Sequence, residues 1–193
     1  NIWNNAVAFN VNAYQIVNSN TYQTSLTNTQ FKEYAGKVRS RGVELDITGN
    51  PTPQLSLIGG VSYNHSVYID TPDGFGYVEN QKLVRTPATT ANGSVFYRFT
   101  GAVKGLIVGA SAFYTGDRKA GWNDTKNQTQ TNRMIDVKGY TTLDFSLGYE
   151  LKKFLIQGKV GNLFNAESWN IHENYSVNPI TPRNFYVTVS YKL

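Results

Sequence analysis

The chain ends in the stretch Asn184-Phe-Tyr-Val-Thr-Val-Ser-Tyr-Lys-Leu193, in which the odd-numbered side chains are apolar or aromatic and the even-numbered ones are mostly polar. Successive side chains of an extended strand point to opposite faces of a sheet. The alternation therefore predicts a β-strand with one apolar face and one polar face.

The same period of two recurs along the whole sequence, and no segment shows a convincing helical periodicity. Leu143, Phe145 and Leu147, for example, alternate with polar or small residues. The pattern predicts about eight strands, over residues 6–17, 37–49, 54–69, 86–99, 105–117, 139–150, 154–163 and 183–193. The predicted fold class is all-β, with an antiparallel up-and-down sheet.

Short and long connections alternate strictly between these strands. The short ones are 49–53, 100–104 and 151–153, and the long polar ones are 18–36, 70–83, 118–138 and 165–183. In an up-and-down antiparallel sheet, this order places every tight turn at one end and every long loop at the other.

The two predicted faces differ in the way that a transmembrane β-barrel wall requires. Aromatic residues lie toward the strand ends of the apolar face, where an aromatic girdle belongs: Tyr63, Tyr97, Phe99, Tyr149 and Tyr191. The opposite face carries charged residues: Glu44, Asp46, Arg98, Asp144 and Lys159. Unpaired burial of such charges in a dry core is expensive, whereas a wet lumen solvates them. We therefore predict a segment of a transmembrane β-barrel.

A soluble antiparallel fold of the lipocalin or jelly-roll kind also alternates, with an apolar inner face. Periodicity alone does not separate the two architectures. The aromatic placement, the loop asymmetry and small residues on the apolar face favour the membrane barrel. These small residues are Gly59, Gly93, Gly158, Ala110 and Ala112.

Composition excludes several other classes of protein. The 193 residues include no Cys, which excludes a disulfide scaffold, a zinc finger, an iron–sulfur site and a thiol enzyme. No apolar run approaches the roughly 18 residues that a membrane-spanning helix needs. The net charge is +5, but Lys and Arg are scattered and form no basic stripe. We therefore predict no nucleic-acid partner.

Local motifs, in their order and spacing, resemble the C-terminal barrel portion of TonB-dependent outer-membrane receptors. The stretch Gly36-Lys-Val-Arg-Ser-Arg-Gly-Val-Glu-Leu45 is similar to the family's strand with an Arg-Ser-x-Gly-Val-Glu core. Gly139-Tyr-Thr-Thr-Leu-Asp144 resembles its Gly-Tyr-x-x-x-Asp strand start, and Gly161-Asn-Leu-Phe-Asn165 its Asn-Leu-Phe-Asp/Asn signature. Pro182-Arg-Asn-Phe185 is similar to the Pro-Arg-x-Phe that opens the family's final strand.

The resemblance implies that residues 1–193 are the C-terminal part of a transmembrane β-barrel in the bacterial outer membrane, with the plug domain and the earlier strands outside this sequence. The tight turns are then periplasmic and the long loops extracellular. The implied function is TonB-dependent active uptake of a scarce nutrient, best matched by a ferric siderophore, with no cofactor. The implied partners are that nutrient, the TonB complex acting through the plug, and outer-membrane lipid and lipopolysaccharide.

Two other functions compete with this interpretation. A complete small eight-stranded outer-membrane protein with an adhesion or structural role would show the same alternation, and its interior would be filled by side chains. A soluble β-barrel that binds an apolar ligand is the third possibility.

The residues do not predict an enzyme. His65 and His172 are far apart in the sequence, and no His or Cys spacing typical of a metal site occurs. The adjacent His172 and Glu173 point apart on an extended segment, which makes a solvated loop the simpler interpretation. We predict no catalytic residue and no metal ligand.

Aromatic and cationic residues of the long loops are the candidates for ligand contact, because ferric siderophores are often anionic and aromatic. These candidates are Arg118, Trp122, Arg133, Trp169, His172 and Tyr175. Trp122 and Trp169 are also compatible with anchoring at the membrane interface. Arg39 and Arg41, at the outer end of a strand, suit either a lipopolysaccharide phosphate or the capping of a loop.

Overall fold

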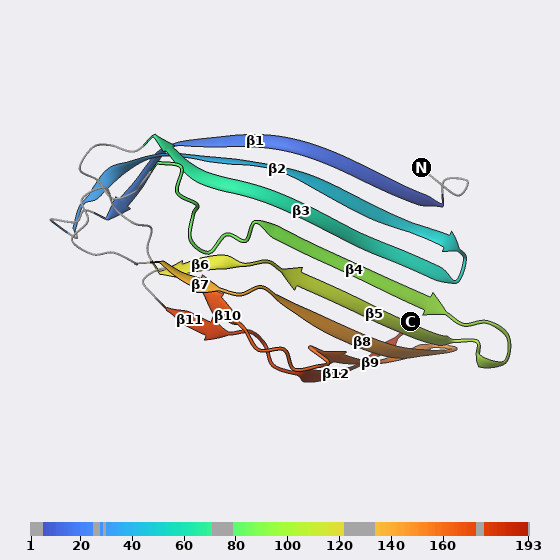
Figure 1. Cartoon of the computed structure of the whole chain (residues 1–193). Coiled ribbons are helices and arrows are strands. Elements are labelled where there is room, and N and C mark those ends of the chain that lie inside the picture. The colour runs from blue at the N-terminus through green and yellow to red at the C-terminus, as the bar shows by residue number, and fades with distance from the viewer. Residues whose placement is uncertain are drawn as a thin grey trace.

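A single curved antiparallel sheet makes up most of the molecule (Figure 1). The computed structural model describes residues 6–24, 28, 30–70, 79–121, 134–172 and 176–192. The sheet has the order β1-β2-β3-β4-β5-β8-β9-β12. Its strands are β1 (Val7–Thr24), β2 (Lys32–Thr52), β3 (Leu55–Asp70), β4 (Thr89–Arg98), β5 (Leu106–Thr115), β8 (Tyr140–Leu151), β9 (Phe154–Gly161) and β12 (Asn184–Tyr191).

Two short hairpins are inserted into this order. The first pairs β6 (Arg118–Gly121) with β7 (Met134–Val137), and the second pairs β10 (Trp169–Ile171) with β11 (Val177–Pro179). A single 3₁₀ turn, η1 (Gly101–Val103), lies in the connection between β4 and β5. Among the described residues, no helix is long and apolar enough to cross a membrane.

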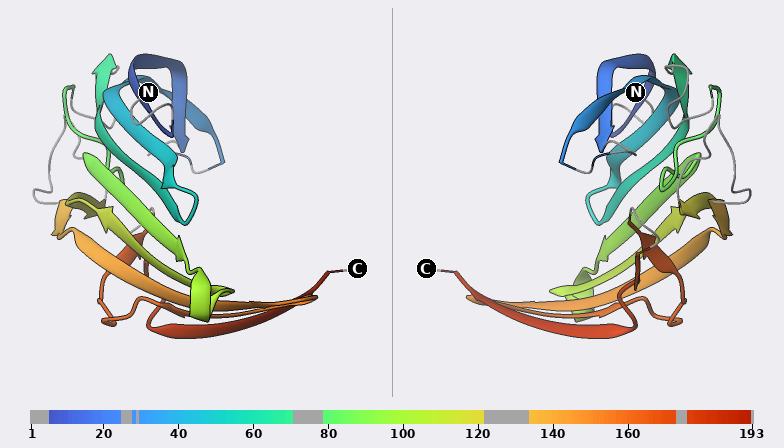
Figure 2. Two further views of the ribbon diagram at one scale, coloured as in Figure 1. Left: turned by 90° about the vertical axis from the view of Figure 1, so that its right-hand side faces the viewer. Right: turned by 90° about the vertical axis from the view of Figure 1, so that its left-hand side faces the viewer.

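The sheet is one layer thick and bends into an open arc, with β1 at one edge and β12 at the other (Figure 2). The connections β2–β3, β4–β5 and β8–β9 are the short ones, and they lie together at the end we call the turn end. The two inserted hairpins lie at the opposite end, which we call the loop end. The predicted up-and-down topology, with tight turns and long connections at opposite ends, is confirmed.

The predicted strands match the observed ones closely except at β1 and β2. The strand predicted over 6–17 continues to Thr24, and the one predicted over 37–49 begins at Lys32. Much of the predicted loop 18–36 therefore belongs to the β1–β2 hairpin, which extends beyond the rest of the sheet. A bulge near Asn18 interrupts the pairing of these two strands. The prediction was wrong here because this stretch is polar on both faces, so its sequence does not alternate.

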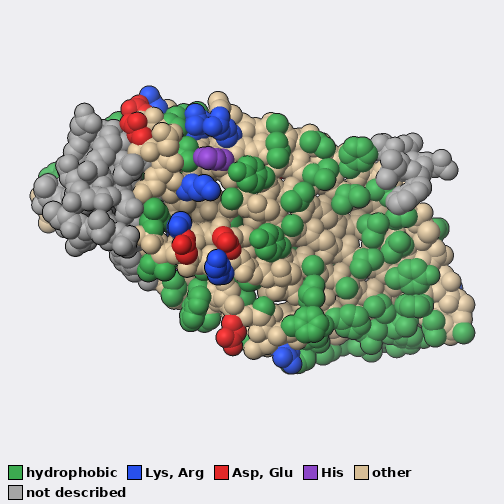
Figure 3. All heavy atoms as spheres, viewed as in Figure 1, with side chains coloured by type: hydrophobic (Ala, Val, Ile, Leu, Met, Phe, Trp, Pro, Cys, Tyr) green, Lys and Arg blue, Asp and Glu red, His purple; other side chains and the backbone are tan. Residues whose placement is uncertain are grey.

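The convex face of the sheet is apolar and exposed. The strand register places Phe9, Ile47, Gly59, Gly93 and Ala112 in one row across it. Val11 is 66% exposed and Leu147 is 50% exposed, although both are aliphatic. Figure 3 shows apolar side chains spread over this face. A continuous apolar surface of this kind is stable against lipid and unfavourable in water.

Few apolar side chains are buried within the described residues, which is why the sheet has no core of the soluble kind. The buried ones are Val7, Val67, Tyr68, Ala120 and Ile180. At the turn end, aromatic rings pack along the strand ends: the centroids of Tyr97 and Phe99 are 4.8 Å apart, and those of Phe154 and Tyr191 are 5.0 Å apart. Of the residues predicted for an aromatic girdle, Tyr97, Phe99, Tyr149 and Tyr191 lie at this end, whereas Tyr63 lies toward the loop end, opposite Thr89 at the start of β4.

Charged and polar side chains occupy the concave face and pair across the strands. Lys159 Nζ lies 2.8 Å from Asp144 Oδ2. Glu150 accepts hydrogen bonds from both Arg98 and Lys192. The side chains that the sequence pattern assigned to this face include Arg98, Asp144 and Lys159, and these pairs compensate their charges.

Candidate functional site

The concave face at the loop end carries the strongest candidate for a functional site, because polar groups, aromatic residues and two recesses come together there. The β10–β11 hairpin and the β6–β7 hairpin both rise from this end of the sheet (Figure 1). Their positions depend on two buried polar side chains, Asn162 and Arg118.

Asn162 holds the turn that follows β9. Its side chain is 4% exposed. Its Nδ2 donates to the carbonyl oxygens of Ala166 (2.9 Å) and Thr181 (3.1 Å), and its Oδ1 accepts from the Ala166 N–H (2.8 Å). The residue has φ of 49°, a left-handed conformation that Asn tolerates better than most residues. The three hydrogen bonds and the left-handed backbone explain why the second residue of the Gly161-Asn-Leu-Phe-Asn165 motif is Asn.

Asp144 links this turn to the wall. One carboxylate oxygen accepts the main-chain N–H of Asn162 at 2.9 Å, and the other pairs with Lys159. The Asp144 side chain is 15% exposed, whereas that of Lys159 is 47% exposed. Asp144 therefore holds the turn in place, while the ammonium group of Lys159 remains accessible from the lumen.

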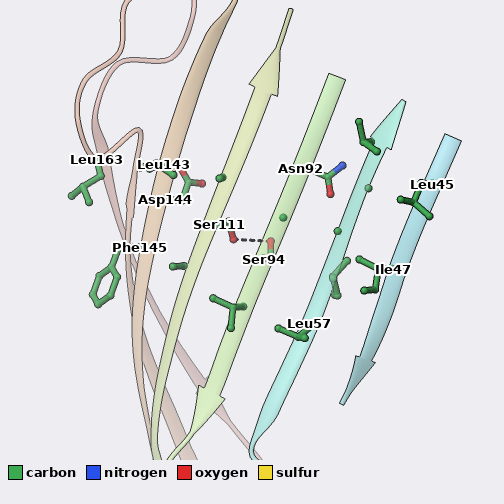
Figure 4. A pocket seen from close by; sticks show the side chains of 18 of the residues that line it. Leu45, Ile47, Leu57, Asn92, Ser94, Ser111, Leu143, Asp144, Phe145 and Leu163 are labelled. Atoms are coloured by element: carbon green, nitrogen blue, oxygen red, sulfur yellow. Dashed lines mark hydrogen bonds between the residues drawn. The ribbon is translucent and has the colours of Figure 1, made fainter. Parts of the chain in front are cut away.

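A polar recess of about 400 Å³ lies on the concave face beside this pair. Its lining includes Asp144, Lys159, Asn162, Asn184 and Tyr186. Neighbouring strands in the wall are joined by further polar contacts, such as the hydrogen bond of 2.8 Å between the hydroxyls of Ser94 and Ser111 (Figure 4). The recess presents ammonium, amide and hydroxyl groups, which suit an anionic or polyhydroxylated ligand.

Arg118, a predicted ligand contact, is 8% exposed. Its guanidinium group donates to the carbonyl oxygens of Gly116 and Lys138, at 3.5 Å each, and to that of Trp169. It also lies over the ring of Tyr140, 5.3 Å from the centroid. Arg118 thereby joins the base of the β6–β7 hairpin to β10, and its planar group is occupied by protein contacts.

Trp169, a second predicted contact, is brought next to Arg118 by this hydrogen bond, and its side chain remains 51% exposed. It borders a second recess of about 540 Å³ between the two hairpins. Ile135 and Val177 add apolar surface there, and Lys138 adds a cation. The carboxylates of Asp136 and Glu167 line the same recess, which therefore combines an exposed indole and aliphatic side chains with charges of both signs and suits a partly aromatic, charged ligand.

The remaining predicted contacts are not assembled with these two. His172 is exposed, and its Nε2 lies 3.2 Å from Asn178 Nδ2 across the β10–β11 hairpin. Trp122, Arg133 and Tyr175 lie outside the described residues. In the part of the chain that the structure describes, no group of His, Asp or Glu side chains could hold a metal ion.

The β6–β7 hairpin carries an ion pair of its own. Lys119 on β6 pairs with Asp136 on β7, which is its partner in the strand register. This hydrogen bond and the charge of Lys119 hold the pKa of the Asp136 carboxyl below its ordinary value. Asp136 lines the second recess together with Trp169.

Sequence reasoning missed the groups that shape the two recesses. Asn162 and Tyr140 were quoted only as members of motifs, and Lys138 lay in a predicted loop. Asp144 and Lys159 lie on the lumen-facing wall, as the sequence predicts, but the contact of Asp144 with Asn162 is not predictable from the sequence pattern. The detectable signal was Asn within a Gly-Asn-Leu-Phe-Asn turn, since Asn favours left-handed turn positions.

Sequence comparison identifies relatives with known roles. The chain is 25% identical over 181 residues to the metal-pseudopaline receptor CntO of Pseudomonas aeruginosa strain UCBPP-PA14, covering 92% of this chain and 24% of the relative. It is 28% identical over 159 residues to the catecholate siderophore receptor Fiu of Escherichia coli K12, covering 80% of this chain and 20% of that relative. The chain thus spans about a quarter or less of the length of these relatives.

Solved structures show the same fold. The closed form of the ferric-catecholate import receptor Fiu from E. coli K12 superposes with a TM-score of 0.74 at 22% identity, over 98% of this chain and 26% of that one. The ferripyoverdine receptor of the P. aeruginosa outer membrane superposes with a TM-score of 0.74 at 18% identity, over 98% of this chain and 25% of that one.

The family profile described as "TonB dependent receptor-like, beta-barrel" matches residues 1–163. Members of this family are outer-membrane β-barrel proteins that act as receptors and transporters and not as enzymes. The exposed apolar convex face and the polar concave face are what such a wall requires. The chain therefore belongs to the TonB-dependent receptor family, as part of its outer-membrane β-barrel.

Proposed function

We propose that residues 1–193 form the C-terminal part of the barrel wall of a receptor that takes up a scarce nutrient across the outer membrane, with a ferric siderophore as the substrate. The plug domain, through which the TonB complex would act, and the earlier strands belong to the rest of that protein. The wall lies against outer-membrane lipid and lipopolysaccharide, and the loop end faces outward.

The observation that carries this proposal is the recess between the two hairpins, bordered by Trp169, Ile135 and Lys138. It lies at the loop end, where an incoming ligand would first meet the wall. The named relatives, CntO and Fiu, are receptors for a metal–pseudopaline complex and for catecholate siderophores. In this proposal Trp169 stacks on the ligand, Arg118 holds Trp169 in place, and Lys138 attracts the ligand's negative charge.

The predicted contacts His172, Trp122, Arg133 and Tyr175 remain part of the proposal as candidates on the neighbouring loops. The alternative of a complete eight-stranded barrel is less well supported, because a closed barrel requires β1 to pair with β12. Instead these two strands stand at opposite edges of the sheet. Each edge then suits pairing with further strands of a larger wall.

The test uses the full-length receptor that contains this chain. Its denatured mass in outer-membrane fractions should be several times 21.6 kDa, the mass of these residues. Binding of a ferric tris-catecholate and of a ferric hydroxamate is then measured by fluorescence quenching. We expect Trp169→Ala to weaken binding of the recognised chelate by at least about tenfold, since aromatic anchors dominate binding energies.

Phe185→Ala is the matched control, because Phe185 is an exposed aromatic residue of the convex face that a luminal ligand does not touch. Equal weakening in both variants would show a general folding effect. A receptor that binds no ferric chelate, or a membrane protein of only 21.6 kDa, would refute the proposed function.

A further inference from the structure

Two arginines and a histidine form a cluster on the convex face at the loop end. We call Arg39, Arg41 and His65 the basic cluster. Arg39 and Arg41 are two residues apart on β2, so they share a face about 6.6 Å apart along the strand. Arg41 is the register partner of His65 on β3. Figure 3 shows basic and histidine side chains gathered on this face between the apolar surface and the loop end.

The basic cluster stands where the apolar belt ends. On β2, the outward residues on the turn side of Arg41 are the exposed Val43, Leu45 and Ile47. On β3, Tyr63 is the next outward residue on the turn side of His65, and it is 49% exposed. In a membrane barrel, an aromatic residue at the edge of the apolar belt marks the level of the lipid headgroups.

Among the residues that the structure describes, no carboxylate pairs with the two arginines of the cluster. Arg39 Nε, moreover, is shielded from solvent and has no hydrogen-bond partner within the described residues. The nearby Lys37, in contrast, pairs with Asp70 at 2.8 Å. Guanidinium groups without a protein partner at the edge of a lipid-facing surface are available to pair with an external anion.

A surface hollow of about 460 Å³ lies beside Arg41. Its lining includes Gln15, Arg41, Val43, Tyr63 and His65. The side chains of Arg41, Gln15 and His65 provide hydrogen-bond donors, and Val43 and Tyr63 provide apolar surface. This combination fits a phosphate group that is attached to an apolar body, because free phosphate would gain nothing from the apolar side.

We propose that the basic cluster binds a phosphate group of lipopolysaccharide, with the acyl chains of the same molecule lying over the apolar side chains next to it. Arg39 and Arg41 pair with the phosphate, His65 and Gln15 donate hydrogen bonds, and Tyr63 contacts the sugar–acyl boundary. This inference rests on the outer-membrane placement in the proposed function, in which the loop end faces outward, but it does not depend on which nutrient is taken up.

The test measures lipid binding to the purified full-length receptor by native mass spectrometry in detergent, with diphosphorylated lipid A as the probe. We expect the wild-type receptor to bind lipid A, and the double variant Arg39→Gln/Arg41→Gln to bind it at least about tenfold more weakly, because each charge-assisted hydrogen bond contributes substantially. Phosphatidylethanolamine should bind both proteins alike. Inorganic phosphate should not displace lipid A.

Lys104→Gln is the matched control, since it removes one exposed cation from the β4–β5 connection at the turn end and leaves the basic cluster and both recesses unchanged. Unaltered lipid A binding by the double variant would overturn the proposal, as would equal loss in the Lys104→Gln control or displacement by inorganic phosphate. Heat-modifiable electrophoretic migration verifies that each variant is folded. Ferric-chelate binding, measured in parallel, should be unchanged, so failure of this inference is distinguishable from failure of the proposed function.

Discussion

The main-chain N–H of Asn162 donates a hydrogen bond of 2.9 Å to the Asp144 carboxylate, and this contact joins the turn after β9 to the neighbouring strand β8. The same carboxylate pairs with Lys159, so the turn, β8 and β9 share one polar connection. The β10–β11 hairpin and the polar recess beneath it depend on this connection, because Asn162 also holds the segments that lead into and out of the hairpin.

Substitution of Asn162 by Ala should destabilise the barrel. The change removes the amide bonds to Ala166 and Thr181 and leaves their buried carbonyl groups unpaired, which we expect to lower the free energy of unfolding by about 2 kcal/mol. The measurement is a urea titration of the full-length receptor in detergent. Asn165→Ala is the control, since Asn165 is exposed and its side chain accepts one hydrogen bond from Arg183 N. An equal effect of both changes would contradict the role given to Asn162.

Arg118→Lys should loosen the β10–β11 hairpin while it preserves the charge. A lysine ammonium lacks the planar fork that reaches several carbonyl oxygens and covers the Tyr140 ring. We expect amide hydrogen exchange at His172 and Ile180, whose N–H groups bond within this region, to accelerate by about tenfold. Lys119→Gln on the same strand should leave these rates unchanged. Unaltered exchange in Arg118→Lys would show that the hairpin is held by other contacts.

Two glycines of the wall should respond to substitution in opposite ways. A Cβ atom added at Gly93 meets nothing within 4 Å, since the residue borders an apolar hollow of about 720 Å³ (Figure 4). Gly93→Val should therefore be neutral or stabilising by up to about 1 kcal/mol, because valine favours strands. A Cβ at Gly42 would lie 2.2 Å from the Tyr63 carbonyl oxygen, so Gly42→Val should cost about 1–3 kcal/mol. Urea titration of both variants compares them, and equal effects would refute this account.

Acid should weaken the β6–β7 hairpin. The pKa of Asp136 is lowered by its hydrogen bond to Lys119, so the ion pair stabilises the hairpin above the ordinary carboxyl pKa of 3.8 and the stabilisation is lost as the pH falls through the lowered value. We expect amide protection in Arg118–Gly121 to fall below about pH 4 at low salt. Asp136→Asn should remove this pH dependence. A decline of the same size in that variant would assign the effect to another group.

The wall was predictable from sequence because lipid and lumen impose opposite chemistry on alternate residues. In β8, the alternation from Leu143 to Tyr149 fixes which side chains face lipid, and the strand is observed within one residue of its predicted bounds. The hairpins were not predictable in this way. The strands β6, β7, β10 and β11 have three or four residues each, too few for a period to be seen.

The candidate site was predictable only by residue type. Arg118 and Trp169 were selected as a cation and an aromatic residue of the long loops, and the structure brings them into contact. Their different environments, with Arg118 buried and Trp169 exposed, arise from contact between two hairpins that are distant in the sequence. Local sequence carries no signal for such an arrangement, since it depends on which strand ends meet in the folded sheet.

Strands β5 and β8 pair with each other although the β6–β7 hairpin lies between them in the chain, and β9 pairs with β12 across the β10–β11 hairpin in the same manner. A residue gained or lost within either hairpin therefore leaves the register of the wall unchanged. Natural variation can exchange these hairpins, together with the recesses they border, on a constant scaffold. Diversification of ligand preference then requires no compensating mutation in the membrane-facing strands.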